Sequence, residues 1–348
     1  MDLGSPRPRA ETHDRCGSRQ CCEYTCKRGR TTTTHGSRLL HVARGLKQPM
    51  RSTRVNRKGL RPASTNQTTS PREPKGLGAK ISGSDRHTQG PSEMLLILMY
   101  HRAVDCRLGN SVPVLRAHFA HLRERCNVVL PGEPLLGQRL NVCLSFDDAY
   151  ADFHGLVFPL LEELSLHALL AVPTAFVIEK TGRGLEERLS VSPDGDAAMQ
   201  GGVFKEKAPF CTWEELREIA SSGLVRIASH GHSHADLTRA DVNVEFEASH
   251  SKALLERRLG VPVSTFVYPF GRVNRRSHAA VKREFAYAMR IGSALNTDWR
   301  PVRQPLCRVV ADAVPDIVRL LSRASLARFE AKWAANRIRA AFGKWEPW

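Results

Sequence analysis

The chain has 348 residues and a formal net charge of +17 at pH 7. The positive charge is concentrated at one end, because residues 1–93 contain 19 Lys and Arg against 7 Asp and Glu, whereas the rest of the chain contains 33 against 28. No run approaches the ~20 apolar residues of a membrane span, and no secretion signal is recognisable. The sequence therefore predicts no transmembrane segment and favours a cytoplasmic location.

The first quarter of the chain, residues 1–93, is rich in Ser, Thr, Gly, Pro and Arg and has almost no apolar periodicity. Such a segment buries too little apolar surface to offset chain entropy, which predicts a disordered basic tail. A second interpretation is that the true start lies near Met94 and that residues 1–93 are a start-site artefact. A basic arm can also bind nucleic acid, but no aromatic residues are interleaved with the charges, so we expect no nucleic-acid partner.

From Met94 onward, apolar runs typical of buried strands alternate with segments of helical periodicity. The expected strands are 94–100, 142–146, 169–177, 225–228, 263–268 and 286–290. The expected helices are 113–126, 152–165, 212–222, 241–259 and 275–285, with a long loop at 181–209 and a helical stretch at 316–342. This alternation predicts a parallel β/α domain over 94–314, followed by a C-terminal helical tail over 315–348.

Polar residues follow the expected strands at the point where each strand ends. They are His101, Asp147, Asp148, His230 and Tyr268. In β/α barrels, chemistry is concentrated at the carboxyl ends of the strands. The positions of these residues therefore predict one site at that edge.

The pair Asp147-Asp148 and the pair His230 and His234 together suggest a metal centre. One carboxylate and two imidazoles form a three-ligand set for a divalent cation that leaves a position open for water. The spare aspartate can then act as a general base. Taken alone, an Asp pair after a strand is more often a helix N-cap. The joint pattern favours metal-assisted hydrolysis instead.

Four motifs in order resemble those of the polysaccharide deacetylase family, also called carbohydrate esterase family 4 or the NodB homology domain. They are Leu-Met-Tyr-His-Arg at 98–102, Ser-Phe-Asp-Asp-Ala-Tyr-Ala-Asp at 145–152, Ser-His-Gly-His-Ser-His at 229–234 and Phe-Val-Tyr-Pro-Phe-Gly at 266–271. The resemblance covers roughly 94–310. It implies a distorted (β/α) barrel with fewer than eight regular strands, and a hydrolase of carbon–nitrogen (non-peptide) bonds that removes N-acetyl, sometimes O-acetyl, groups from a glycan.

The resemblance also implies roles for individual residues. Asp147 matches the general base. The metal ligands match Asp148, His230 and His234, with zinc as the expected metal. The backbone N–H of Phe270 matches the donor that helps to hold the tetrahedral oxyanion.

Three departures from the family pattern stand out. Ala149 replaces the usual glycine after the Asp pair, which should be tolerated unless this position needs a positive φ. The arginine that orients the base is absent from the third motif, and Arg308, in a late strand, is the candidate to replace it. The late histidine that acts as general acid has no clear counterpart. His101 is the candidate for a catalytic residue at the rim, with a structural role as the alternative.

The combined prediction is a metal-dependent sugar N-deacetylase of a bacterial type, acting on a surface polysaccharide or its precursor. One alternative is a hydrolase of a non-sugar amide on the same fold. Another is a weakly catalytic glycan-binding module, although such a module would not need a base beside a metal. The expected partner is a glycan or N-acetylated sugar substrate.

Overall fold

The computed structural model describes residues 94–190, 195–299 and 305–341, all within the unit Ile81–Trp348. The predicted basic tail, residues 1–93, therefore lies outside the described residues. The boundary predicted between 314 and 315 remains a prediction.

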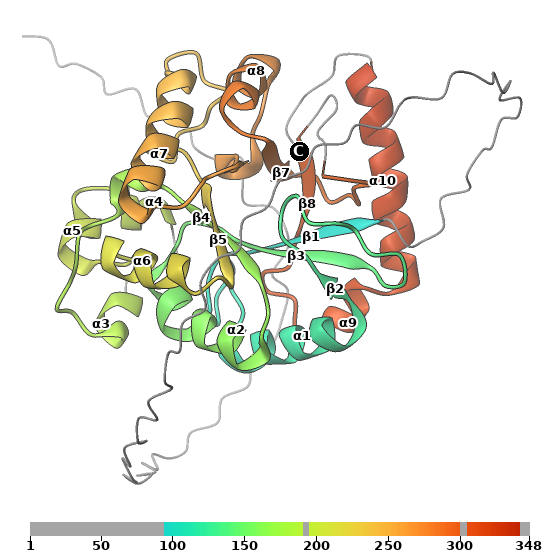
Figure 1. Cartoon of the computed structure of the whole chain (residues 1–348), viewed down its shortest axis with the longest axis horizontal. Coiled ribbons are helices and arrows are strands. Elements are labelled where there is room, and N and C mark those ends of the chain that lie inside the picture. The colour runs from blue at the N-terminus through green and yellow to red at the C-terminus, as the bar shows by residue number, and fades with distance from the viewer. Residues whose placement is uncertain (1–93, 191–194, 300–304, 342–348) are drawn as a thin grey trace, which may run out of the picture. The chain divides into compact units, whose positions relative to one another are not determined.

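The core of the described chain is a parallel barrel (Figure 1). The strands are β1 (Leu95–Tyr100), β2 (Asn127–Val128), β3 (Asn141–Phe146), β4 (Ala168–Val172), β5 (Val225–Ser229), β6 (Thr265–Val267), β7 (Tyr287–Ile291) and β8 (Leu306–Val310). Their order is β1-β8-β7-β6-β5-β4-β3-β2, and β1 also pairs with β3, which closes a ring and leaves β2 outside it. The predicted distorted (β/α) barrel is confirmed.

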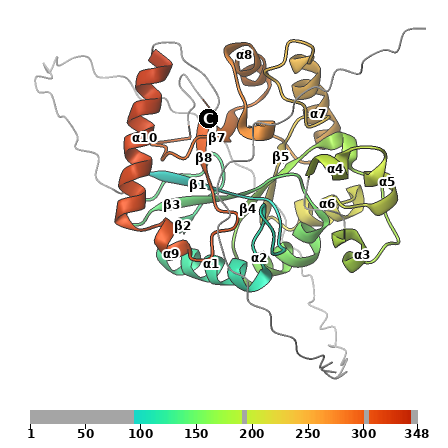
Figure 2. The same ribbon diagram turned by 180° about the vertical axis from the view of Figure 1, so that it is seen from behind.

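Helices surround the barrel, as Figures 1 and 2 show from opposite sides. They are α1 (Val112–Arg125), α2 (Phe158–Leu164), α3 (Leu185–Leu189), α4 (Gly195–Met199), α5 (Val203–Lys207), α6 (Trp213–Ser221), α7 (Val244–Leu259), α8 (Arg275–Glu284), α9 (Ile317–Leu320) and α10 (Arg323–Ala341). No helix among the described residues is long and apolar enough to cross a membrane.

Side chains alternate between the inside of the barrel and the layer beneath the helices. On β1, Leu95 and Ile97 belong to the inner cluster, whereas Leu96 and Leu98 pack in the outer cluster with helix residues. On β3, Cys143 belongs to the inner cluster, so the period of two also turns residues 145 and 147 inward. The same alternation on β8 starts from Leu306 and turns residue 308 inward. Residues 147 and 308, which are far apart in the sequence, are thereby both directed into the barrel interior.

Most predicted helix boundaries are reproduced, and their capping residues explain them. A capping box opens α6, because Thr212 Oγ1 accepts from Glu215 N and the Glu215 carboxylate accepts from Thr212 N. Helix α7 ends at Gly260, whose φ of 68° suits a residue without a Cβ. The helix predicted at 152–165 opens instead with a π-helical turn, Phe153–Val157, before α2 begins.

The long loop predicted at 181–209 is wrong in part, since α3, α4 and α5 form within it. Arg188 of α3 fixes this segment to α6 and to the chain that precedes α6. Its guanidinium donates to both carboxylate oxygens of Glu215 and to the carbonyls of Ala208 and Phe210. The helices are only five residues long and depend on such tertiary contacts rather than on propensity, which is why periodicity did not reveal them.

The C-terminal helices pack on the outside of the barrel. Ile317 of α9 is buried in the outer cluster, and Phe329 of α10 packs against that cluster. Asn336 of α10 is buried and donates to Cys307 Sγ in β8, at 3.7 Å. The helical stretch predicted at 316–342 is therefore present as α9 and α10.

Candidate metal and catalytic centre

Chemically active side chains from four strands meet at the carboxyl edge of the barrel. Asp147 and Asp148 follow β3, His230 follows β5, His101 follows β1, and Asp312 comes two residues after β8. His234 comes from the loop that begins at His230. Because parallel strands present their carboxyl ends at one edge, residues separated by more than 200 positions become neighbours.

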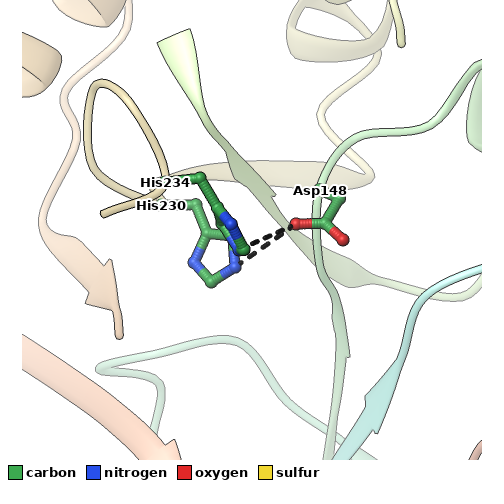
Figure 3. A group of neighbouring side chains, drawn as sticks. All are labelled: Asp148, His230 and His234. Carbon is green, nitrogen blue, oxygen red and sulfur yellow. Dashed lines mark ion pairs between the residues drawn. The ribbon is translucent and has the colours of Figure 1, made fainter. Parts of the chain in front are cut away.

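The predicted metal ligands are brought together. Asp148 Oδ1 lies 3.5 Å from His230 Nε2 and 3.4 Å from His234 Nε2, and one ligand atom of each residue lies within 4.8 Å of the others. Figure 3 shows both imidazoles turned toward the Asp148 carboxylate. All three side chains are buried or nearly so, with exposures of 8%, 3% and 11% for Asp148, His230 and His234.

The hydrogen-bonding pattern of this group fits a divalent cation. His230 Nδ1 lies 2.8 Å from the carbonyl oxygen of Val267, and a carbonyl only accepts, so Nδ1 carries the hydrogen. Burial lowers the pKa of His230 to about 4, so near neutral pH its Nε2 presents a lone pair. Asp148 Oδ1 is buried and accepts no hydrogen bond. The bare Nε2 of His230 and the Oδ1 of Asp148 thus face each other at 3.5 Å without a hydrogen bond, as two ligands do in a metal site.

The backbone around the Asp pair adopts the left-handed region. Asp148 has a φ of 67° and Ala149 a φ of 50°, a conformation that L-residues adopt at a cost of about 1–3 kcal/mol each. The sequence analysis expected Ala149 to be tolerated unless its position needs a positive φ. The position does have a positive φ, so alanine carries this cost where glycine would not. Ala149 is also fully buried, so surrounding packing must hold the strained turn that aims Asp148 at the histidines.

Asp147 is held by Arg308. Arg308 Nη1 donates to Asp147 Oδ1 at 2.6 Å and Nη2 donates to Oδ2 at 2.9 Å, and Nη1 also reaches Ser145 Oγ at 3.1 Å. Burial would raise the pKa of Asp147, but the charge of Arg308, together with His230 and the hydrogen bonds from Arg308, lowers it to about 2. Arg308 therefore lies where the prediction needed an arginine to orient the base. Its catalytic role remains a prediction.

His101 is held by Asp312. The carboxylate accepts from His101 N at 2.9 Å and lies 2.6 Å from His101 Nδ1. Burial would lower the pKa of His101, but the hydrogen bond and charge of Asp312, with the charges of Asp147 and Asp148, raise it to about 9. His101 Nε2 then faces Asp147 Oδ2 at 3.9 Å. A protonated imidazole and an ionised carboxylate thus flank the same space at neutral pH.

Phe270 and Tyr268 occupy different environments. Phe270 has a φ of 58°, its side chain is 46% exposed, and its ring centroid lies 4.6 Å from that of His234. Tyr268 follows β6 directly, as expected, but its side chain is fully buried in the outer cluster and its hydroxyl pairs with His278 Nδ1 at 3.0 Å. Residue 268 is thus part of the core, and Phe270 is the residue of this segment that lies beside the centre.

Asp312 is a residue of this cluster that the sequence analysis missed. It follows the apolar stretch of β8, so the rule that selected Asp147 after its strand would also have selected Asp312. The omission arose because the stretch at 306–310 was noted only for its arginine.

The family model for polysaccharide deacetylases matches residues 138–288, which include Asp147, Asp148, His230 and His234. Over these residues the chain is similar to the polysaccharide deacetylase family. The chain is also similar to the poly-beta-1,6-N-acetyl-D-glucosamine N-deacetylases of Escherichia coli K12 and O157:H7, with 31% identity over 128 residues. The match spans 33% of this chain but only 16% of the length of these relatives.

Solved structures share the barrel fold. A Streptococcus pyogenes deacetylase in complex with acetate superposes with a TM-score of 0.51 at 18% identity and covers 68% of this chain and 97% of its own. IcaB from Ammonifex degensii gives a TM-score of 0.50 at 18% identity and covers 74% and 98%. A polysaccharide deacetylase from Bacillus cereus gives 0.50 at 19% identity and covers 64% and 66%. At this level of identity the likeness concerns the fold alone.

Proposed function

We propose that this chain is a metal-dependent hydrolase that removes N-acetyl groups from glucosamine residues of a polysaccharide. The family match and the similarity to the Escherichia coli N-deacetylases support this proposal. The observation that carries it is the pairing of Asp147, held by Arg308, with His101, held by Asp312, beside a three-donor set.

The proposed metal is zinc, held by Asp148, His230 and His234, because two imidazoles and one carboxylate match the donors of catalytic zinc sites. Such an ion, when bound, supplies Lewis acidity that acidifies water and polarises the amide carbonyl. This chemistry matches the state of Asp147. With a pKa of about 2 its carboxylate is always ionised near neutral pH but is a weak base, so it needs a water that is already acidified.

The remaining steps belong to the side chains of this protein. Asp147 accepts a proton from the attacking water while the water oxygen bonds to the acetyl carbon. The bidentate contact with Arg308 keeps the Asp147 carboxylate in place. His101 donates its Nε2 proton to the departing nitrogen as the C–N bond breaks, which releases acetate and a free amine. The backbone N–H of Phe270 donates to the carbonyl oxygen as negative charge develops there.

The two titratable groups suit these opposite tasks because their environments push their pKa values apart. Asp147 is ionised and His101 is protonated over the same pH range. A structural ion pair would gain little from placing His101 Nε2 at 3.9 Å instead of at hydrogen-bond distance from Asp147 Oδ2. The gap leaves room for reacting atoms between base and acid.

The test is acetate release by the purified full-length chain loaded with zinc, with β-1,6-linked N-acetylglucosamine oligosaccharides as substrate. We expect release that depends on zinc and is lost in Asp147→Asn. An O-acetylated sugar and a non-sugar N-acetyl amide, run in parallel, test the alternatives. No acetate from any N-acetylated glycan, with zinc bound, would contradict the proposal.

A further inference from the structure

The two metal-binding histidines lie on a loop that has no regular structure of its own. We define the metal loop as residues 230–234. Strand β5 ends at Ser229, and the loop turns through positive φ at Gly231 (77°) and at His234 (55°). A positive φ at a non-glycine residue is strained. Something outside the loop must therefore hold the two imidazoles at the separation that a metal requires.

Glu247 of α7 makes the contacts that can do so. Its Oε2 accepts from the backbone N–H groups of His232 and Ser233, at 2.7 and 2.9 Å, and its Oε1 accepts from Ser233 Oγ at 2.5 Å. These donors lie between His230 and His234 in sequence. One side chain thus fixes the middle of the metal loop from a separate helix.

The chemistry of this contact suits a carboxylate. All three groups that face Glu247 donate, and an ionised carboxylate only accepts. Glu247 is 5% exposed, so its hydrogen bonds are shielded from water and gain strength from its charge. The turn is built closely around it, because a Cβ added at Gly231 would lie 3.0 Å from Glu247 Oε2.

A second connection between α7 and the metal loop reinforces the first. Ser251 Oγ lies 2.6 Å from Ser229 Oγ, which in turn accepts from Gly231 N at 3.1 Å. Ser251 Oγ also donates to the carbonyl of Glu247 at 2.6 Å. Helix capping does not explain these contacts, since Asn243 caps α7 by accepting from Phe246 N. The Glu247 side chain is directed at the loop instead.

We propose that Glu247 is a positioning residue of the metal centre, which holds the metal loop so that His230 and His234 converge and thereby sets the affinity for the cation. This inference rests on the metal site of the proposed function. Glu247 does not touch the metal or the substrate. It acts through the loop backbone, and its effect should appear in zinc binding itself, before any catalysis.

The experiment measures the zinc dissociation constant of the full-length chain by competition with a chelator, together with the melting temperature of the zinc-free protein. Loss of the partners that orient metal ligands typically weakens affinity about 10–100-fold, and we expect a loss in this range for Glu247→Ala. Glu247→Gln should fall between Ala and the unaltered chain, because its amide oxygen can accept both backbone N–H groups while its NH₂ donates to Ser233 Oγ.

The matched control is Glu245→Ala. Glu245 is on the same helix, but its side chain is 64% exposed and faces Arg283 at 3.6 Å, so zinc affinity should stay within about twofold. A purely structural role of Glu247 would lower the melting temperature of the zinc-free protein and leave zinc affinity of the folded molecules unchanged. We expect Glu247→Ala to weaken zinc affinity more than it lowers the melting temperature, and Glu247→Gln to restore part of that affinity.

Zinc affinity unchanged in Glu247→Ala would overturn the inference while leaving the metal site intact. Should Glu247→Ala not fold, Ser233→Ala and Glu247→Gln carry the test, and unchanged affinity in both would overturn it equally. No zinc bound by the unaltered chain would instead remove the metal site of the proposed function, and this inference with it.

Discussion

The two halves of the centre place adjacent residues of the same type in opposite environments. The metal half contains Asp148, with His230 and His234. The proton-transfer half contains Asp147 and its neighbour in space, His101. Burial raises the pKa of Asp148, against the opposing charges of His230 and His101, whereas Arg308 overcomes the same burial and lowers the pKa of Asp147 to about 2.

The difference lies in where each half finds its counter-charge. In the proton-transfer half, Arg308 neutralises Asp147 and Asp312 neutralises His101, so both groups are satisfied by the chain itself. In the metal half, Asp148 Oδ1 accepts no hydrogen bond and His230 is directed at it through a bare nitrogen. One half is electrostatically complete, and in the other the proposed cation would supply the missing positive charge. Mutations in the two halves should therefore fail in different ways.

The largest effect is expected from removing a donor of the metal half. His230→Ala should lose bound zinc as well as activity, because a ligand should matter more than the outer partners whose loss costs about 10–100-fold. The measurement is zinc content per chain together with acetate release. His232→Ala is the matched control and should keep zinc, because His232 is outside the three-donor set. Its Nδ1 lies 2.9 Å from Thr174 Oγ1 and its ring packs on His250. Stoichiometric zinc in a His230→Ala/His234→Ala double variant would contradict the assignment.

A change in the proton-transfer half should separate chemistry from metal binding. Asp147→Asn should keep zinc, because Asp147 lies outside the three-donor set, and should lose about 10²–10⁴-fold in turnover as a general base is removed. Zinc content and kcat measured on the same preparation test this. If both stay near those of the unaltered chain, Asp147 has a structural role only.

The smallest effect concerns the pH dependence of stability through Asp312 and His101. The pKa of His101 is raised from 6.5 to about 9. A raised pKa means that the folded state binds the proton more tightly, so this stabilisation is fully present below pH 6.5 and is lost as the pH rises through about 9. Asp312→Asn should remove most of it, on the order of 1–3 kcal/mol.

The measurement is the free energy of unfolding of zinc-free protein, compared between the unaltered chain and Asp312→Asn at several pH values. The difference should be largest below pH 6.5, shrink as the pH rises from 6.5 to about 9, and stay small above that. A remaining, pH-independent difference is expected from the lost hydrogen bond to His101 N. A difference that stays constant over this range would show that Asp312 does not control the charge of His101.

Local signals in the sequence were enough to predict the barrel and the metal half. Strands β1, β3 and β5 are mostly apolar and buried, and each leads directly into a residue of the centre. Asp148, His230 and His234 therefore lie close to a recognisable strand end. The spacing of His230 and His234 within one loop made the donor set visible without knowledge of any long-range contact.

The proton-transfer half was harder to predict because its contacts join strands that are far apart in sequence. Arg308 was selected only because an expected arginine was missing elsewhere, and nothing local indicates that its side chain meets Asp147. Glu247 was not selected, because it lies within a helix and its contacts with His232 and Ser233 span more than ten residues, whereas Asp312 follows a strand end and was overlooked. The positive φ at Ala149 was also hidden, because alanine gives no signal for it.

The pairing of β1 with β8 joins the last strand of the barrel to the first, and it determines when the centre is complete. The donors of the metal half are complete by residue 234, whereas Arg308 and Asp312 arrive with the last strand. A chain that lacks β8 would keep Asp148, His230 and His234 but would have an unpaired base and an unsupported acid. Arg308 is in register with Ile97 of β1, so the pairing that adds β8 to the barrel also places the arginine. The proposed hydrolytic activity would thus require the last strand, although the candidate metal ligands do not.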